Sequence, residues 1–297
     1  KLPPLRHPAE PLGYIKKPIA SRYGMGRVLV SSGGGDNMMG AIGTGNVTPG
    51  VCTVSLGTSG TVYSYFGDPF VDPEGEIASF CDSTGGWLPL LCTMNVTNTT
   101  EYFKSMHGLS NEELETRASR APAAADGLLF LPFIDGERVP VLPHSSGVIF
   151  GLDKRTFNAA HIARAIMEGT ILNLGYGFSR MRSLGLRPSE IRATGGGARS
   201  PLWLQIIADI FRTPVITLAE QEAAAYGAAL QSIWTYLNEK GQSAAIADIV
   251  AQRVKPAKKP VRPQKENFAV YDSLQARFNS LWKTLEGEFR AHGRAAG

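Results

Sequence analysis

One acidic residue, Asp36, follows three consecutive glycines in the segment SSGGGDNMMGAIGTG (31–45), and further glycines come after it. Glycine runs cost backbone entropy, so a compact protein keeps them where the chain must bend or approach another molecule closely. A carboxylate on such a loop can accept a proton from a hydroxyl group within hydrogen-bond distance. An acid at this place can also cap the helix that follows, here NMMGAIG. The sequence therefore predicts a proton acceptor, a helix cap or both at Asp36.

Two further glycine loops adjoin predicted strands: LGTSG (56–60) and TGGGA (194–198). Backbone N–H groups of such loops bind anions, and phosphate in particular. Other nucleotide and nucleophile motifs do not fit the sequence. It has no GxxxxGK[ST], GAIGTG (40–45) does not match GxGxxG, and GTSG does not match GxSxG. A phosphate-binding hairpin and a glycine turn before a helix remain, which is the arrangement of actin-like ATPases and sugar kinases.

Six segments resemble the FGGY carbohydrate kinases, and among these most closely the xylulokinases, in the order found in that family. They extend over nearly the whole chain and are SGGGDN, SLGTSGTV, FLPFIDGERVP, GVIFGLDKRTFNAAHIARAIMEG, TGGGARSPLWLQIIADIF and EAAAYGAA. The resemblance implies an α/β protein of the ribonuclease H-like, actin-like ATPase fold, with ATP and sugar bound between two lobes. It also implies that this chain is the C-terminal lobe and that the N-terminal lobe, with its DxGT-type phosphate loop, is missing from it.

The same resemblance implies roles for single residues. Asp36 matches the catalytic base and lies against the sugar, and Asn37 matches a position that contacts sugar hydroxyls. Two sets match the ATP-binding segments: Gly57, Thr58 and Ser59 the phosphate loop, and Gly195, Gly196, Gly197 and Ala198 the adenosine-binding turn. A tight hairpin without ligand is the alternative for the first set. The helix near 97–103 is expected to form the other wall of the adenine slot.

These residues are positioned by an alternation of strands and helices. The patterns predict a strand at 27–30, a hairpin at 51–66, strands within 77–94 and at 127–134, a strand with a glycine turn at 189–200, and a strand at 215–218. Helices are predicted within 95–120, at 161–185, after Ser200 as N-cap and Pro201, at 222–238 and near the C-terminus. Gly227 and the alanines around it are expected to serve close helix packing.

The resemblance and the composition together predict four parts of the chain. These are an inter-lobe linker segment (1–26), the nucleotide-binding lobe (27–252), a basic proline-rich linker (253–266) and a C-terminal helix packed on the lobe (267–297). Most of the net charge of +4 falls in RVKPAKKPVRPQK (253–265). Its interleaved prolines and lack of aromatic residues favour a solvated linker over a nucleic-acid site.

Composition indicates the compartment in which the protein is expected. The chain has 43% apolar and 19% charged residues, and no apolar run approaches the ~20 residues of a membrane span. The N-terminal segment is rich in proline, lacks the apolar core of a signal peptide and does not begin with methionine, which fits a fragment. Three cysteines without a pairing pattern favour a reducing, cytoplasmic setting. The histidines show no metal-ligand spacing, so the sequence predicts no protein metal site; Mg²⁺ is expected to arrive with ATP, held by phosphates and water.

The expected function is ATP-dependent phosphorylation of a ketopentose, D-xylulose to D-xylulose 5-phosphate, with the chain alone inactive because half of the cleft is missing. Alternatives are other FGGY substrates (ribulose, fuculose, gluconate or a tetritol) or a non-catalytic nucleotide-binding lobe. An actin-like or chaperone-type ATPase is disfavoured, because GGGDN is a sugar-kinase feature. The expected partners are the sugar, ATP and the missing lobe, without nucleic acid or membrane, and a homodimer stays open.

Overall fold

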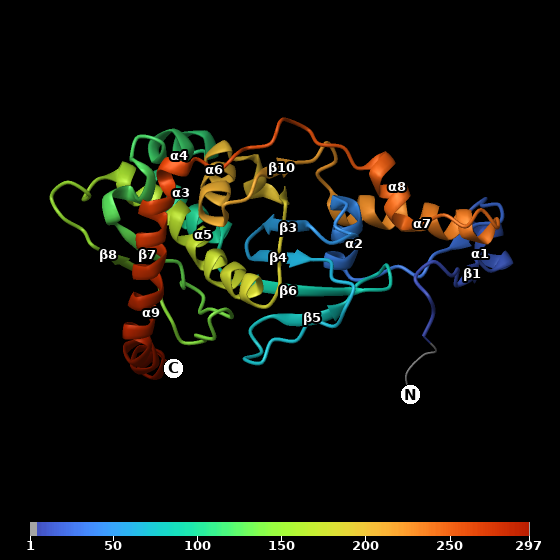
Figure 1. The fold of residues 1–297 in the computed structure, drawn as a ribbon, viewed down its shortest axis with the longest axis horizontal. Helices are drawn as coiled ribbons and strands as arrows, with labels where there is room; N and C mark the ends of the chain where they lie inside the picture. The colour runs from blue at the N-terminus through green and yellow to red at the C-terminus, as the bar shows by residue number, and fades with distance from the viewer. Residues whose placement is uncertain (1–4, 297) are drawn as a thin grey trace.

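The computed structural model describes residues 5–296. Residues 1–4 of the predicted linker segment and residue 297 of the predicted C-terminal helix lie outside the described residues. Among the described residues, a six-stranded mixed sheet forms the centre of the molecule (Figure 1). In spatial order its strands are β10 (Val215–Thr217), β9 (Glu190–Thr194), β3 (Val51–Leu56), β4 (Gly60–Ser64), β6 (Trp87–Thr93) and β5 (Ala78–Cys81).

Strand direction divides the sheet into two parts. The strands β10, β9 and β3 are parallel, whereas β3, β4, β6 and β5 are paired antiparallel. The β3–β4 hairpin pairs Leu56 with Gly60, which confirms the hairpin predicted at 51–66. Because β3 and β9 are parallel with Ser55 opposite Thr194, the loops that follow these two strands lie at the same edge.

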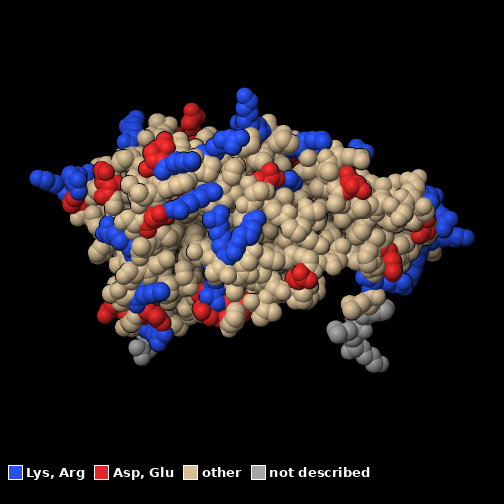
Figure 2. All heavy atoms as spheres, in the orientation of Figure 1, with Lys and Arg blue, Asp and Glu red and all other residues tan. Residues whose placement is uncertain are grey.

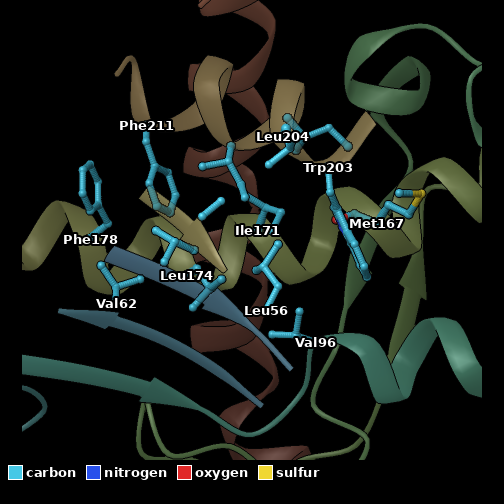
Figure 3. Close-up of a cluster of buried hydrophobic side chains, with 14 of the residues drawn as sticks. Leu56, Val62, Val96, Met167, Ile171, Leu174, Phe178, Trp203, Leu204 and Phe211 are labelled. Carbon is cyan, nitrogen blue, oxygen red and sulfur yellow. The ribbon is translucent and has the colours of Figure 1, made fainter. Parts of the chain in front are cut away.

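One face of the sheet is covered by α5 (Ala159–Ser183) and α6 (Pro201–Phe211). Figure 3 shows Leu56 and Val62 of the hairpin meeting Ile171 and Leu174 of α5 in the main hydrophobic core. The helix α6 begins as predicted. The Ser200 hydroxyl accepts a hydrogen bond from Trp203 N at 3.2 Å, and proline occupies the first helical position.

The opposite face is covered by α2 (Asp36–Thr44), with α7 (Ala223–Glu239) packed behind it. Alternation along β4 produces the two faces, since Val62 lies in the α5–α6 core and Tyr63 packs against Ala41 of α2. A side chain at Gly43 would overlap the carbonyl oxygen of Ala223, and one at Gly227 would overlap that of Met39. The close packing predicted around Gly227 is therefore confirmed.

Smaller elements surround these layers. Two-stranded sheets are formed by β1 (Gly13–Tyr14) with β2 (Leu29–Val30) and by β7 (Leu129–Leu131) with β8 (Val148–Phe150). The remaining α-helices are α1 (Lys17–Arg22), α3 (Thr97–His107), α4 (Asn111–Ala118), α8 (Ile246–Arg253) and α9 (Phe268–Ala296). Single 3-10 turns occur at Ala123–Gly127, Gly196–Arg199 and Lys265–Asn267. The long helix α9 runs along one end of the molecule, far from β1 and α1 (Figure 1).

The basic segment 253–266, for which we expected a solvated linker, lies along strand β10. Val261 pairs with Val215, Pro256 pairs with Leu218, and Ala257 N donates to Thr217 O at 2.8 Å. The division into lobe and linkers stays a prediction, but this segment has a defined place beside the sheet.

Charged residues are distributed unevenly over the face in Figure 2. Lys and Arg are interspersed with Asp and Glu over the left part, where α3 to α6 and α9 lie, and the centre right of this face carries few charges. No helix within residues 5–296 combines the length and the apolar character that crossing a membrane requires.

Candidate functional site

The glycine run places Asp36 at the start of α2. Gly35 has extended backbone geometry (φ −63°, ψ 156°) and is the N-cap, so Asp36 is the first helical residue and not the cap itself. The exposed Asp36 carboxylate accepts hydrogen bonds through Oδ1 from Asn37 N at 2.7 Å and Asn37 Nδ2 at 3.3 Å. Its other oxygen has no partner among the described residues and is available to a ligand.

A buried glutamine of α7 holds the glycine run that precedes Asp36. Gln231 Oε1 accepts from Gly33 N at 3.1 Å, and Gln231 Nε2 donates to Gly33 O at 3.2 Å and to Ser32 Oγ at 2.8 Å. Because α7 also packs closely on α2, both sides of Asp36 are fixed to the same helix. The glutamine gave no signal in the sequence, since it lies in the helix interior, far from the glycine run.

Asp36 and Asn37 line a cavity of about 260 Å³ together with the glycine turn that follows β9. The cavity is open between the N-termini of α2 and α7 and the end of the sheet. Its lining comprises Asp36, Asn37, Gly40, Ser55, Tyr63, Thr194, Gly195, Gly196, Arg199, Gln221, Glu222, Ala223 and Ala224. The structure thus brings the predicted base and the predicted nucleoside turn, about 160 residues apart in the sequence, to one cavity.

A second cavity of about 230 Å³ adjoins the first and shares Thr194, Gly195, Arg199 and Gln221 with it. Its remaining lining is mainly apolar, with two charged residues: Ala193, Ala198, Pro201, Leu204, Thr217, Leu218, Glu220, Ala257 and Lys258. An apolar slot edged by polar groups suits a planar base with a ribose. The helix α3, expected as one wall of such a slot, lines neither cavity.

The residues of the glycine turn have different surroundings. Gly195 has φ +85°, and a side chain there would lie 2.7 Å from Leu56 O, so only glycine fits. A side chain at Gly196 would meet nothing within 4 Å. Gly197 is buried against Leu56 and Trp203 and lines neither cavity. Among these three glycines, Gly195 and Gly196 line a cavity, and Gly197 is a packing residue.

The hairpin loop Gly57–Ser59 lies beside the cavities without lining them. Its carbonyl groups are held by α3, since Thr97 N donates to Gly57 O at 3.0 Å and Val96 N donates to Thr58 O at 2.9 Å. The amide N–H groups of Thr58 and Ser59 have no acceptor within residues 5–296, and both residues are exposed. Two such amides on a loop held at its carbonyl groups are a candidate site for a phosphate oxygen.

Several lining residues were not predicted. Thr194 is the last residue of β9, and Arg199 and Gln221 lie in the segments that follow β9 and β10. Ligands of α/β proteins bind at the carboxyl ends of parallel strands, so this position was an available signal. Tyr63 lies on the α2 face of β4, and burial above all raises the pKa of its phenol, to which the charge of Asp36 adds. Lys258 gave no local signal, because it reaches the second cavity only through the pairing of its segment with β10.

A sequence profile of the FGGY family of carbohydrate kinases, C-terminal domain, matches residues 51–236. The chain is 47% identical over 234 residues to xylulose kinase from Haemophilus influenzae, covering 78% of this chain and 48% of that protein. Xylulose kinase from Streptomyces coelicolor is 36% identical over 247 residues, covering 83% and 49%. The chain thus spans about half the length of these curated relatives.

The fold is shared with solved sugar kinases. The ligand-bound xylulose kinase from Lactobacillus acidophilus superposes with a TM-score of 0.90 at 24% identity, covering 97% of this chain and 58% of that chain. This likeness confirms the predicted α/β fold of the actin-like ATPase type. Since the family profile matches more than half of its residues, the chain belongs to the FGGY family of carbohydrate kinases.

Proposed function

We propose that this chain supplies the base and the nucleotide-binding half of a kinase that phosphorylates D-xylulose to D-xylulose 5-phosphate with ATP. The observation that carries the proposal is the shared cavity of Asp36, Asn37 and the Gly195–Gly196 turn, with the free hairpin amides beside it. The sugar is inferred from the curated relatives described above, both of which are named xylulose kinase.

Asp36 is assigned as the general base. Its carboxylate accepts the proton of the sugar hydroxyl as that oxygen forms its bond to the γ-phosphorus. The bond between the γ-phosphorus and the β–γ bridging oxygen breaks, and its electron pair leaves with ADP. Asn37 can donate and accept hydrogen bonds through its amide, which suits recognition of sugar hydroxyls.

The ATP is assigned to the second cavity, to the adjoining edge of the first cavity at Gly195 and Gly196, and to the hairpin. Gly195, Gly196 and Ala198 leave room for the adenosine, while Gly197 supports the turn from behind. The free amides of Thr58 and Ser59, with the Thr58 hydroxyl, bind the β- and γ-phosphates and stabilise the charge of the transferring group.

The carboxylates of the first cavity, Asp36 and Glu222, fit Mg²⁺ that enters with ATP. The described residues contain no cluster of three or more His, Cys, Asp or Glu side chains that could hold a metal ion. Mg²⁺ favours few protein ligands and keeps phosphate oxygens and waters instead. When bound, the ion would neutralise charge on the phosphates.

Ribulose, fuculose, gluconate and a tetritol remain alternative substrates within this proposal, and a non-catalytic nucleotide-binding lobe is the alternative outside it. The N-terminal lobe is proposed as the missing partner, and the cytoplasm as the location. We predict no nucleic-acid partner, and a homodimer stays possible.

The test is Asp36→Asn in the complete kinase that contains this chain, because the chain alone lacks half of the proposed cleft. We expect kcat for xylulose-dependent ADP release to fall by about a factor of 10³, the range of a lost general base, while ADP affinity is unchanged. Asp68→Asn, an exposed acid on the loop after β4, is the control and should keep full turnover. Near-normal turnover of Asp36→Asn would remove the base assignment. Turnover with another sugar but not with xylulose would replace xylulose by that sugar as the assigned substrate.

A further inference from the structure

A buried carboxylate lies behind the hairpin loop and takes no part in the chemistry assigned above. Glu137 is 3% exposed and lines neither cavity. Its Oε1 accepts hydrogen bonds from Met94 N and from Arg138 N, both at 2.7 Å. Its Oε2 accepts from Asn173 Nδ2 of α5 at 2.9 Å and from Asn95 Nδ2 at 3.4 Å. Four donors on one buried carboxylate fix the chain around it.

The donors Met94 and Asn95 directly precede the residues that hold the hairpin loop. Thr97 N and Val96 N donate to the carbonyl groups of Gly57 and Thr58. Val96 is fully buried, and its Cγ2 lies so close to Gly60 that a side chain at Gly60 would come within 2.7 Å of it. A short, buried path therefore connects Glu137 with the loop through the backbone at 94–97.

We propose that Glu137 is a positioning residue for the phosphate loop: its carboxylate sets the backbone at 94–97, and this backbone aims the amides of Thr58 and Ser59. The inference rests on the proposed function in so far as those amides bind ATP phosphates. The connection between Glu137 and the loop stands on geometry alone.

The carboxylate has two protonation states near neutral pH. Burial raises the pKa of Glu137 to about 7, against the hydrogen bonds from the surrounding donors, which lower it. A protonated Oε2 cannot accept from both amides. Asn173 Oδ1 is buried and has no hydrogen-bond partner within residues 5–296, so rotation of this amide would turn that oxygen toward the new O–H. Protonation of Glu137 thus replaces acceptor capacity on Oε2 with an O–H donor. Oε2 is the atom that accepts the hydrogen bond from the Asn95 side chain.

Other titratable groups face this site. From the same loop come Asp135, which accepts from Asn98 Nδ2 at 2.9 Å, and Arg138, whose Nη1 lies 3.5 Å from Cys92 Sγ on β6. Burial raises the pKa of the Cys92 thiol. On α5 the facing group is the uncharged Asn173. Glu137 is the carboxylate of this set that contacts the backbone leading to the loop.

The first experiment follows the backbone amides of Thr58, Val96 and Thr97 by ¹⁵N–¹H NMR of this chain from pH 5.5 to 8.5, together with the side-chain carboxyl of Glu137 by ¹³C NMR. We expect all four signals to titrate with one midpoint near 7. In Glu137→Gln the amide titration should disappear. Glu76→Gln is the matched control, because burial also raises the pKa of Glu76, which contacts Tyr176 and Arg180 and not the loop. That variant should keep the titration.

The second experiment measures ADP binding to the same proteins by calorimetry. Glu137→Gln at pH 8 should bind about tenfold more weakly than the wild type, the effect of losing roughly one hydrogen bond to a charged group, and the ratio should shrink toward pH 6. Amides that do not respond to pH, or that respond equally in Glu137→Gln, would overturn the positioning role. If the variant does not fold, the wild-type titrations alone test the positioning role. Equal midpoints for the Glu137 carboxyl and the amides would support it, and different midpoints would contradict it. Amides that titrate in a chain without ADP affinity would contradict the proposed function instead.

Discussion

Single residues of the glycine turn meet different structural requirements, although they are neighbours in one motif. Gly195 accommodates a left-handed backbone and the approach of Leu56, whereas Gly196 borders open space. The first requirement concerns folding, and the second keeps open the cavity that we assign to a ligand. A motif match by itself treats both glycines as equivalent.

We therefore expect Gly195→Ala and Gly196→Ala to behave differently. Gly195→Ala should lower the free energy of unfolding by about 1–3 kcal/mol, because the methyl group meets backbone atoms at a strained φ. Gly196→Ala should leave stability within about 0.5 kcal/mol and weaken ADP binding, because the methyl group enters the cavity. Urea unfolding and calorimetry with ADP measure the two effects. Equal loss of stability in both variants would contradict this division.

At the element scale, the contact of α2 with α7 positions Asp36. The helices touch at Gly43 and Gly227 through their backbones, and Gln231 of α7 holds the loop before Asp36. The orientation of the proposed base is therefore a property of a helix pair.

Gly43→Ala should force these helices apart. We expect a loss of roughly 3 kcal/mol in unfolding free energy, because the added carbon overlaps the backbone carbonyl of Ala223 and not the movable end of a side chain. Gly287→Ala in α9, where a side chain meets nothing within 4 Å, should instead stabilise slightly through helix propensity. Thermal unfolding compares the two. A Gly43→Ala protein of normal stability would show that the helix contact is adaptable.

Many of the helices, strands and turns could be predicted from the sequence, because the signals for them are local. The SLGTSG hairpin and the Ser200–Pro201 start of α6 are encoded by adjacent residues, and both are confirmed. For α5, the predicted start at 161 missed the cap at Asn158, whose Oδ1 accepts from Ala160 N and His161 N. The pairing of Val261 with Val215 and the place of Lys258 could not be predicted, because they depend on contacts between distant segments that no local period encodes.

In the whole molecule, two helical layers enclose a sheet, and the loops after β3 and β9 meet at one edge. Buried carboxylates lie on α5 or against it. Besides Glu137, burial raises the pKa of Glu168, which is fully buried beside Arg164 and Tyr271. Arg180 lowers the pKa of Asp72 to about 2. The titrations of Glu137 and Asp72 fall in separate pH windows.

The pH dependence of stability should report Glu137. Its pKa is about 7 in the folded chain and 4.5 as the ordinary value, so the folded state binds the proton more tightly. The contribution of Glu137 to the free energy of unfolding is complete below pH 4.5 and is lost as the pH rises to about 7. This change is on the order of 3 kcal/mol. Urea unfolding at several pH values should give a steeper fall between pH 5 and 8 for the wild type than for Glu137→Gln. Parallel curves would mean that Glu137 ionises normally.

The boundaries of the cavities have a consequence for recombining relatives of this chain. The profile-matched region 51–236 contains the hairpin and the glycine turn, but Asp36, Asn37, Ala257 and Lys258 lie outside it. A chimera that exchanged only this region would combine the proposed phosphate loop of one parent with the acid and a cavity wall of the other. If Asn37 selects the sugar, substrate preference in such a hybrid would follow the parent that donates the flanks, not the parent that donates the matched domain.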